Sequence, residues 1–130
     1  MLSHVMIGTN DIKKSESFYT AVLGVLGVDA PFVNENPTGQ TRLFFRHKGI
    51  VFAVSEPING EAATVANGAT IGFECSSPEQ VKELHDVAVA NGAVSIEDPP
   101  GLREVATGKM YLCYFLDPDG HKICGLHRPG

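Results

Sequence analysis

Short runs in which apolar residues alternate with polar or small ones occur twice, near the start and near the middle of the chain. The first opens the segment His4–Asp11 and the second opens Thr70–Ser77, and the two segments align at an offset of 66 residues. Alternation with a period of two predicts a β-strand with one buried face. Each segment then leads into residues that cap a helix, Thr-Asn-Asp at 9–11 and Ser-Ser-Pro at 76–78. The pattern predicts a strand followed by a helix, twice.

Behind each cap, apolar residues recur at helical spacing. One face of the first helix carries Ile12, Ser15, Tyr19, Val22 and Leu23, and one face of the second carries Val81, Leu84, Val87 and Ala88. Spacings of three, four and seven residues are typical of an amphipathic helix. Gly24 or Gly27 ends the first helix and Asn91-Gly92 ends the second, because glycine tolerates the left-handed conformation found there.

Further strand patterns follow each helix. The predicted strands are Thr41–Arg46, Ile50–Ser55, Met110–Leu116 and His121–His127. Residues 47–49 and 117–120 separate the strands of each pair and are typical of tight turns. Stretches 29–39 and 99–109, rich in Pro and Gly, predict long connections, and 57–68 joins the halves. We therefore expect a single α+β domain of two βαβββ modules, about residues 1–57 and 68–128.

One helix over a few strands covers one sheet face and leaves the other open. We expect the apolar strand positions to face the helices: Val5, Ile7, Ile71 and Phe73. The alternate positions then lie on the opposite face and carry His4, Thr70, Gly72 and Glu74. A face that mixes small and polar residues suits the wall of a ligand pocket better than a core, because unpaired polar groups are costly to bury.

The sequence predicts a solvent-reachable pocket on that face, with the Arg103–Lys109 loop beside its mouth. A long loop next to a strand with two tyrosines is able to close over a pocket and offer a cation to an anionic substrate. The candidate ligand-binding residues are His4, Thr70, Gly72, Arg103, Tyr111 and Cys124. For Cys124 the alternative is a buried, unreactive thiol, and for the loop it is a solvated connection.

The composition argues against several classes of protein. The 130 residues are 43% hydrophobic and 19% charged, with a net charge of −5, which excludes intrinsic disorder. Ten basic against fifteen acidic residues, without a basic cluster, argue against nucleic acid or an anionic membrane as partner. No apolar run is long enough to span a bilayer, and the first residues do not resemble a signal peptide. Three cysteines without a Cys-x-x-Cys motif predict a reducing cytoplasm.

Several motifs together resemble the vicinal-oxygen-chelate superfamily. They are His-Val-x-Ile at 4–7, Asp-Ile at 11–12 followed by Ser-Phe-Tyr at 17–19, Val-Leu-Gly at 22–24, and Asp-Pro-Asp-Gly-His-Lys-Ile at 117–123. That superfamily includes glyoxalase I, extradiol dioxygenases, fosfomycin-resistance enzymes and bleomycin-resistance proteins. The resemblance implies a curved, incomplete barrel of two modules around a cleft, usually in a homodimer. In metal-using members, each module contributes one ligand from its first strand and one from its last.

Most of the ligands that the resemblance implies are replaced. The first-strand histidine is kept as His4, but its counterpart in the second module is Thr70. The last-strand positions carry Ala53 and Cys124, and Glu56 lies three residues out of phase with the first of them. A divalent ion needs about three or more protein ligands for tight binding. We expect no resident metal and no cofactor, with an ion held by His4 and Cys124 as the alternative.

Three functions remain open. The first is a small-molecule-binding protein like the bleomycin-resistance proteins, without the usual metal site. The second is a metal-dependent lyase or isomerase similar to glyoxalase I (lactoylglutathione lyase), in which a metal polarises substrate oxygens while a carboxylate moves a proton. The third is a metal-free enzyme that uses His4 or Glu74 as its base, because several chemistries occur on this fold.

Overall fold

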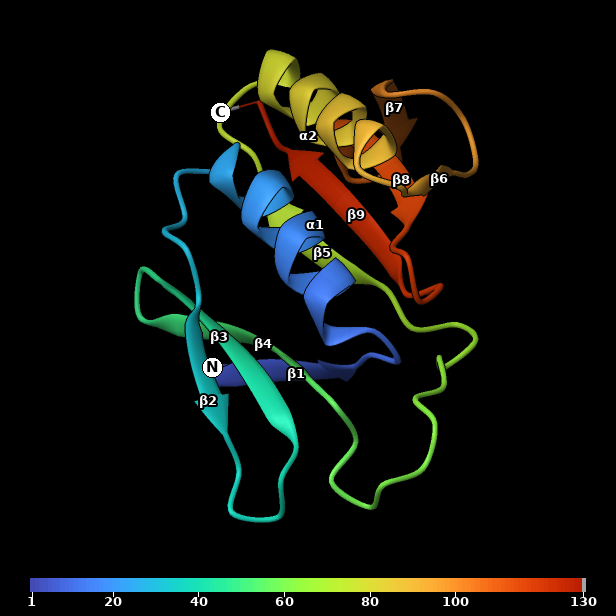
Figure 1. Ribbon diagram of the computed structural model, residues 1–130. Helices are drawn as coiled ribbons and strands as arrows, with labels where there is room; N and C mark the ends of the chain where they lie inside the picture. The colour runs from blue at the N-terminus through green and yellow to red at the C-terminus, as the bar shows by residue number, and fades with distance from the viewer. Residues whose placement is uncertain (130) are drawn as a thin grey trace. The chain divides into compact units, whose positions relative to one another are not determined.

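The computed structural model describes residues 1–129 and separates into two units, Met1–Val65 and a second that begins at Ala66. The first unit contains β1 (His4–Gly8), α1 (Ile12–Gly24), β2 (Phe32–Glu35), β3 (Thr41–His47) and β4 (Ile50–Ser55). The second contains β5 (Ile71–Glu74), α2 (Pro78–Ala90), β6 (Val94–Ser95), β7 (Gly101–Val105), β8 (Gly108–Leu116) and β9 (Lys122–His127). The chain is therefore an α+β protein in which a strand, a helix and a set of further strands occur twice, with three strands after α1 and four after α2 (Figure 1).

Each unit contains one mixed sheet, and the strands of the two sheets pair in a similar way. The strand order is β1-β4-β3-β2 in the first sheet and β5-β9-β8-β6 in the second, where β7 also pairs with β8. In both, the first strand runs parallel to the last, with Val5 opposite Phe52 and Ile71 opposite Ile123, while the other pairs are antiparallel. Val5 and Ile71 thus hold matching places, as the 66-residue offset predicts. Neither sheet closes on itself.

The helices begin at the caps that the sequence predicts. The Asp11 carboxylate accepts a hydrogen bond from the Lys14 amide at 3.1 Å, and the Ser77 hydroxyl accepts one from the Gln80 amide at 3.0 Å. These bonds satisfy amides of the first turn that have no partner within the helix. Pro78 occupies the first helical position, where no amide hydrogen is needed.

The helix of the first unit packs its aromatic side on one face of the sheet. The Tyr19 ring lies 5.0 Å from that of Phe52 and 6.4 Å from that of Phe45, and all three side chains are buried. Phe45 and Phe52 are paired across β3 and β4, so they share a face with Val5. The apolar strand positions therefore lie on the helix side, as predicted.

In the second unit α2 covers β8 and β9, and glycine makes the close approach possible. A Cβ added to Gly125 would lie 2.8 Å from both the Leu84 Cδ2 and the Cys113 Sγ. Leu84 and Cys113 are fully buried. The missing side chain at residue 125 lets helix and sheet close to contact distance, which is one reason for a glycine inside a strand.

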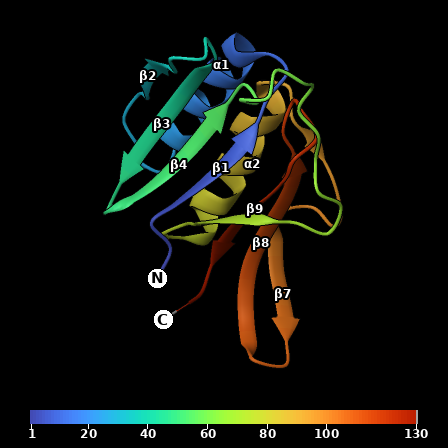
Figure 2. The ribbon, with the colours of Figure 1, turned by 90° about the horizontal axis from the view of Figure 1, so that it is seen from below.

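The prediction of two long connections is wrong. Residues 29–39 contain β2, and residues 99–109 contain β7, which forms a hairpin with β8 (Figure 2). Both strands pair on one side only, and both carry exposed apolar side chains such as Phe32 and Leu102. A strand without a buried face shows no clear alternation, so periodicity misses it. The second module consequently has four strands after its helix.

Within residues 1–129, no helix is long and apolar enough to cross a membrane.

The packing at Gly125 yields a stability prediction. Gly125→Ala places a methyl group 2.8 Å from two buried atoms, so we expect a loss of about 1–3 kcal/mol in the free energy of unfolding. The matched control is Gly72→Ala on the neighbouring strand, where the added Cβ meets only the Cys124 Cβ at 4.0 Å. Urea unfolding followed by circular dichroism measures both. Equal stability of the two variants would show that the layer at residue 125 is loosely packed.

Candidate functional site

The second sheet has a face turned away from α2, which we call the open face of the second unit. Cross-strand pairing places Gly72, Cys124 and Tyr114 side by side in one row on this face. Gly72 is exposed, and a Cβ there would meet nothing closer than the Cys124 Cβ at 4.0 Å. The row therefore has open space at Gly72 beside a polar tyrosine.

Four side chains on and beside this row form a connected network. Tyr114 and Cys124 interact through their side chains, and the Lys122 Nζ lies 4.7 Å from the centroid of the Tyr114 ring. Lys122 also forms an ion pair with Glu97. Burial raises the pKa of Tyr114, with the nearby Cys124 adding to the effect. The hydroxyl is thus a neutral hydrogen-bonding group at neutral pH.

The structure also gives the positions of Thr70, Glu74 and Tyr111. Thr70, a predicted ligand-binding residue, is exposed and directly precedes β5, while Glu74, the candidate base, is exposed at the end of β5 and lies on the open face through its pairing with Leu126. Tyr111 pairs with His127, so it lies on the α2 side of the sheet, opposite to Cys124. The tyrosine on the open face is Tyr114, which pairs with Cys124.

Arg103 is on the open face but is used within its own segment. Its guanidinium donates to the backbone carbonyls of Gly101 at 3.2 Å and of Asp98 and Pro99 at 3.0 Å each. Lys109 lies 3.8 Å from Glu104 across the β7–β8 hairpin. These contacts stabilise a hairpin, where the sequence predicts a long loop.

The three thiols are buried and protonated at neutral pH. Burial raises the pKa of Cys75 to about 11 and that of Cys113 to about 12. It also raises the pKa of Cys124, whose thiol donates weakly to the Gly125 carbonyl at 3.5 Å. A nucleophile or a metal ligand has to be a thiolate. Cys124 is therefore a buried, protonated thiol, which agrees with the alternative of a buried and unreactive residue.

In the first unit His4 lies on the sheet face turned away from α1, the open face of that unit. The side chain is exposed, and its Nδ1 is 2.7 Å from the Ser3 hydroxyl. Ala53, at the last-strand position where the resemblance implies a carboxylate, pairs with Met6 on the same face and is fully buried. The Glu56 carboxylate accepts a hydrogen bond from the Thr41 amide at 2.7 Å and so stabilises the strand ends.

These donors do not fit the divalent ion that many relatives of this kind use. Of the four positions concerned, one is a methyl group at Ala53, one a neutral hydroxyl at Thr70 and one a protonated thiol at Cys124. Only His4 offers a ligand that a borderline or hard divalent ion accepts readily. We therefore assign no step to a metal.

Arg42 lies on the open face of the first unit and was not among the predicted site residues. The Arg42 Nε is buried and has no hydrogen-bond partner within residues 1–129, although the guanidinium lies 5.6 Å from the centroid of the Phe44 ring. Leaving a buried donor unpaired costs about 1–3 kcal/mol. The signal available in the sequence was a pair of arginines, Arg42 and Arg46, on either side of the apolar run 43–45 in a predicted strand.

A second missed arrangement joins α2 to the edge strand β6. The His85 Nδ1 lies 3.1 Å from the Asp86 carboxylate, and its Nε2 lies 2.7 Å from the Ser95 hydroxyl. Hydrogen bonds from Lys82 and His85 lower the pKa of Asp86. We interpret these contacts as structural: they attach β6 to α2 through His85, while Asp86, the next residue of the helix, is paired with Lys82.

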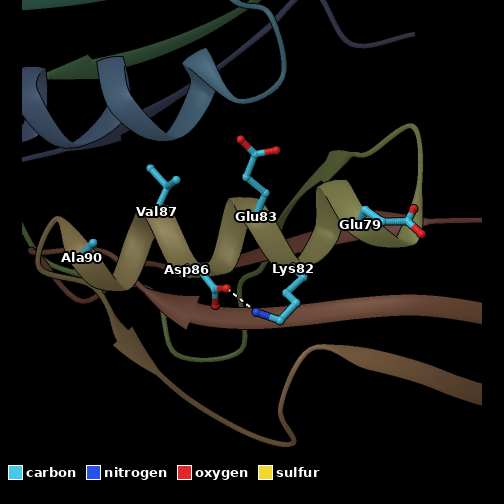
Figure 3. Close-up of a pocket in the computed structure, with 6 residues that line it drawn as sticks. All are labelled: Glu79, Lys82, Glu83, Asp86, Val87 and Ala90. Carbon is cyan, nitrogen blue, oxygen red and sulfur yellow. Dashed lines mark hydrogen bonds and ion pairs between the residues drawn. The ribbon is translucent and has the colours of Figure 1, made fainter.

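A hollow of about 460 Å³ lies along the outer side of α2 (Figure 3). All of its lining residues come from this one helix: Glu79, Lys82, Glu83, Asp86, Val87 and Ala90. Val87, which the helical pattern assigns to the core, is only half-buried. The lining is mainly the solvated charged side of an amphipathic helix, so the hollow does not compete with the open faces as a ligand site.

Comparison with known proteins agrees with the fold. The sequence model of the Glyoxalase/Bleomycin resistance protein/Dioxygenase superfamily matches residues 1–124. A glyoxalase/bleomycin resistance protein from Albidiferax ferrireducens T118 is 48% identical, with a TM-score of 0.90 over 98% of this chain and 99% of that one. A glyoxalase-related enzyme from Fulvimarina pelagi is 23% identical, with a TM-score of 0.73 over 99% and 88% of the two chains.

The fosfomycin resistance protein FosX from Listeria monocytogenes, complexed with Mn(II) and sulfate, is 18% identical, with a TM-score of 0.71 over 99% of this chain and 93% of that one. No curated protein matches the chain. The TM-score shows that FosX shares the fold, and at 18% identity the likeness says nothing about the chemistry of this chain.

The buried thiols yield a reactivity prediction. At pH 8 we expect the folded protein to react with a disulfide reagent such as DTNB at least about 100-fold more slowly than the protein unfolded in urea, because a raised pKa leaves little thiolate. Absorbance at 412 nm follows both reactions. The prediction is wrong if one thiol of the folded protein reacts as fast as in the unfolded protein. If this fast reaction is lost in Cys124→Ser, Cys124 is the reactive residue.

Proposed function

We propose that this chain, which belongs to the Glyoxalase/Bleomycin resistance protein/Dioxygenase superfamily, binds a small organic molecule on its open faces without a tightly held metal ion. The observation that carries the proposal is the row through Gly72, Cys124 and Tyr114. It leaves space at Gly72 beside a hydroxyl and a cation from Lys122. Ligand sites in proteins combine an apolar wall with a few well-placed polar groups of this kind.

The donor chemistry supports binding over metal-assisted catalysis. A lyase or isomerase of the glyoxalase I type needs an ion that polarises substrate oxygens. Ala53, Thr70 and the protonated Cys124 stand at three of the four positions that would hold one. A metal-free enzyme would instead use His4 or Glu74 as its base, and both side chains are exposed. Binding requires neither group to be activated.

The setting of the protein is part of the proposal. Its three cysteines are free and buried, which suits a reducing compartment such as the cytoplasm. We also propose a homodimer, from the habit of the superfamily, and sedimentation at micromolar concentration tests that point.

The ligand site is tested by filling the space at Gly72. A thermal-shift screen with small aromatic acids, glutathione adducts and glycopeptide drugs first supplies a ligand. We expect Gly72→Phe to weaken its binding at least tenfold while leaving the melting temperature of the free protein within a few degrees, because the added side chain meets open space.

The matched control is Gly24→Phe at the exposed end of α1, where an added Cβ meets nothing within 4 Å. It should bind as the wild type does. If Gly72→Phe binds normally, the open face of the second unit is not the ligand site. If it unfolds, residue 72 is part of the core packing.

The metal question has its own measurement. After purification without a histidine tag, we expect less than one tightly bound divalent ion per chain by plasma emission spectroscopy, because three of four donor positions lack a suitable ligand. A stoichiometric ion that is lost in His4→Ala would contradict the proposal and favour the metal-dependent lyase or isomerase.

A further inference from the structure

The open face of the first unit carries two arginines with an aromatic ring between them. Arg42, Phe44 and Arg46 occupy alternate positions of β3, and Phe44 pairs with Ala53, which in turn pairs with Met6 on β1. The rows of Phe45 and Phe52 face α1, so the Arg42–Phe44–Arg46 side faces away from the helix. Along one strand face, successive side chains are about 7 Å apart.

Arg42 differs from its neighbour Arg46 in what surrounds it. Arg46 is exposed, whereas Arg42 is half-buried and its Nε is shielded from solvent without a partner. Within residues 1–129 neither arginine forms an ion pair. Glu56, which follows the Ser55 that pairs with Arg42, accepts a hydrogen bond from the Thr41 amide. Arg42 therefore presents a cation that the described part of the chain does not neutralise.

The positions around Arg42 on this face are uncharged. Across the row it pairs with Asn34 on β2 and Ser55 on β4. In the next row Phe44 pairs with Phe32, whose ring centroid is 6.5 Å away and whose side chain is 62% exposed. A protein with a net charge of −5 thus keeps one partly buried cation beside two aromatic rings.

A guanidinium in this setting favours one ligand geometry. Its two Nη groups, unlike the buried Nε, form a planar fork that is open to a ligand and matches the two oxygens of a carboxylate. The ring of Phe44 lies against the guanidinium and limits its orientation, so little side-chain freedom is lost when an anion binds. The rings of Phe44 and Phe32 offer a surface on which a flat apolar body can pack, at about one side-chain spacing from the fork.

We propose that the ligand is an aromatic carboxylate, with its carboxylate on the Arg42 fork and its ring packed against Phe44 and Phe32. The inference rests on the proposed small-molecule binding and specifies the chemical class of the ligand. Arg46, exposed and two positions beyond Phe44, lies outside this contact.

The test compares 2-naphthoate with its neutral isostere 2-naphthamide by chemical-shift titration of the ¹⁵N-labelled full chain. We expect the acid to bind at least tenfold tighter than the amide and to move the Nε–H resonance of Arg42. In Arg42→Gln the acid should bind no tighter than the amide. Arg46→Gln, the control, should keep the tenfold preference.

The outcomes separate this inference from the broader proposal. If acid and amide bind equally well to the wild type, the carboxylate class is wrong while small-molecule binding stands. If the acid moves no resonance at 5 mM, or if Arg42→Gln keeps the preference, the inference fails and binding rests on the wider ligand screen. If Arg42→Gln does not fold, Arg42→Lys takes its place. Lysine keeps the positive charge but lacks the planar fork. We therefore expect Arg42→Lys to bind the acid less than threefold tighter than the amide. A tenfold tighter binding of the acid by this variant would contradict the role of Arg42.

Discussion

A single helix covers only one face of the sheet on which it packs, and this constraint organises both units of the molecule. In the first unit the rings of Tyr19, Phe45 and Phe52 fill the space under α1, and in the second Leu84 closes on the strand at Gly125. Each unit supplies one helix, so the other side of each sheet has to be satisfied in another way. That side carries polar and cationic residues beside small buried ones such as Ala53 and Cys124.

Because each helix covers one sheet face, unreactive buried groups lie under the helix and polar groups lie on the open face. Cys75 and Cys113 lie in the layer against α2, where burial raises the pKa of each thiol and makes it inert. On the open faces, Tyr114 keeps a hydroxyl beside the cation of Lys122, and Arg42 keeps a donor without a partner. Groups of this kind are costly in a dry core and useful against a ligand. The fold family supplies the scaffold, and these side chains decide what the chain can bind.

Much of this arrangement is readable from the sequence, because buried strands and capped helices leave periodic signals. The alternation at His4–Ile7 and the caps at Asp11 and Ser77 predict strands and helix starts that the structure contains. Edge strands such as β2 do not alternate clearly, since neither face is fully buried, and the Pro and Gly residues around them resemble a loop. Tyr111 and Tyr114 show a further limit: only the register fixes which face each one takes.

The central claim is that ligands bind where the helices do not cover the sheets. It is tested most directly by a crystal structure of the full chain with the best ligand of the thermal-shift screen. We expect electron density for that ligand against an open face, in contact with Gly72 or Arg42. Density for the ligand in the hollow along α2, against Lys82 and Asp86, would contradict it.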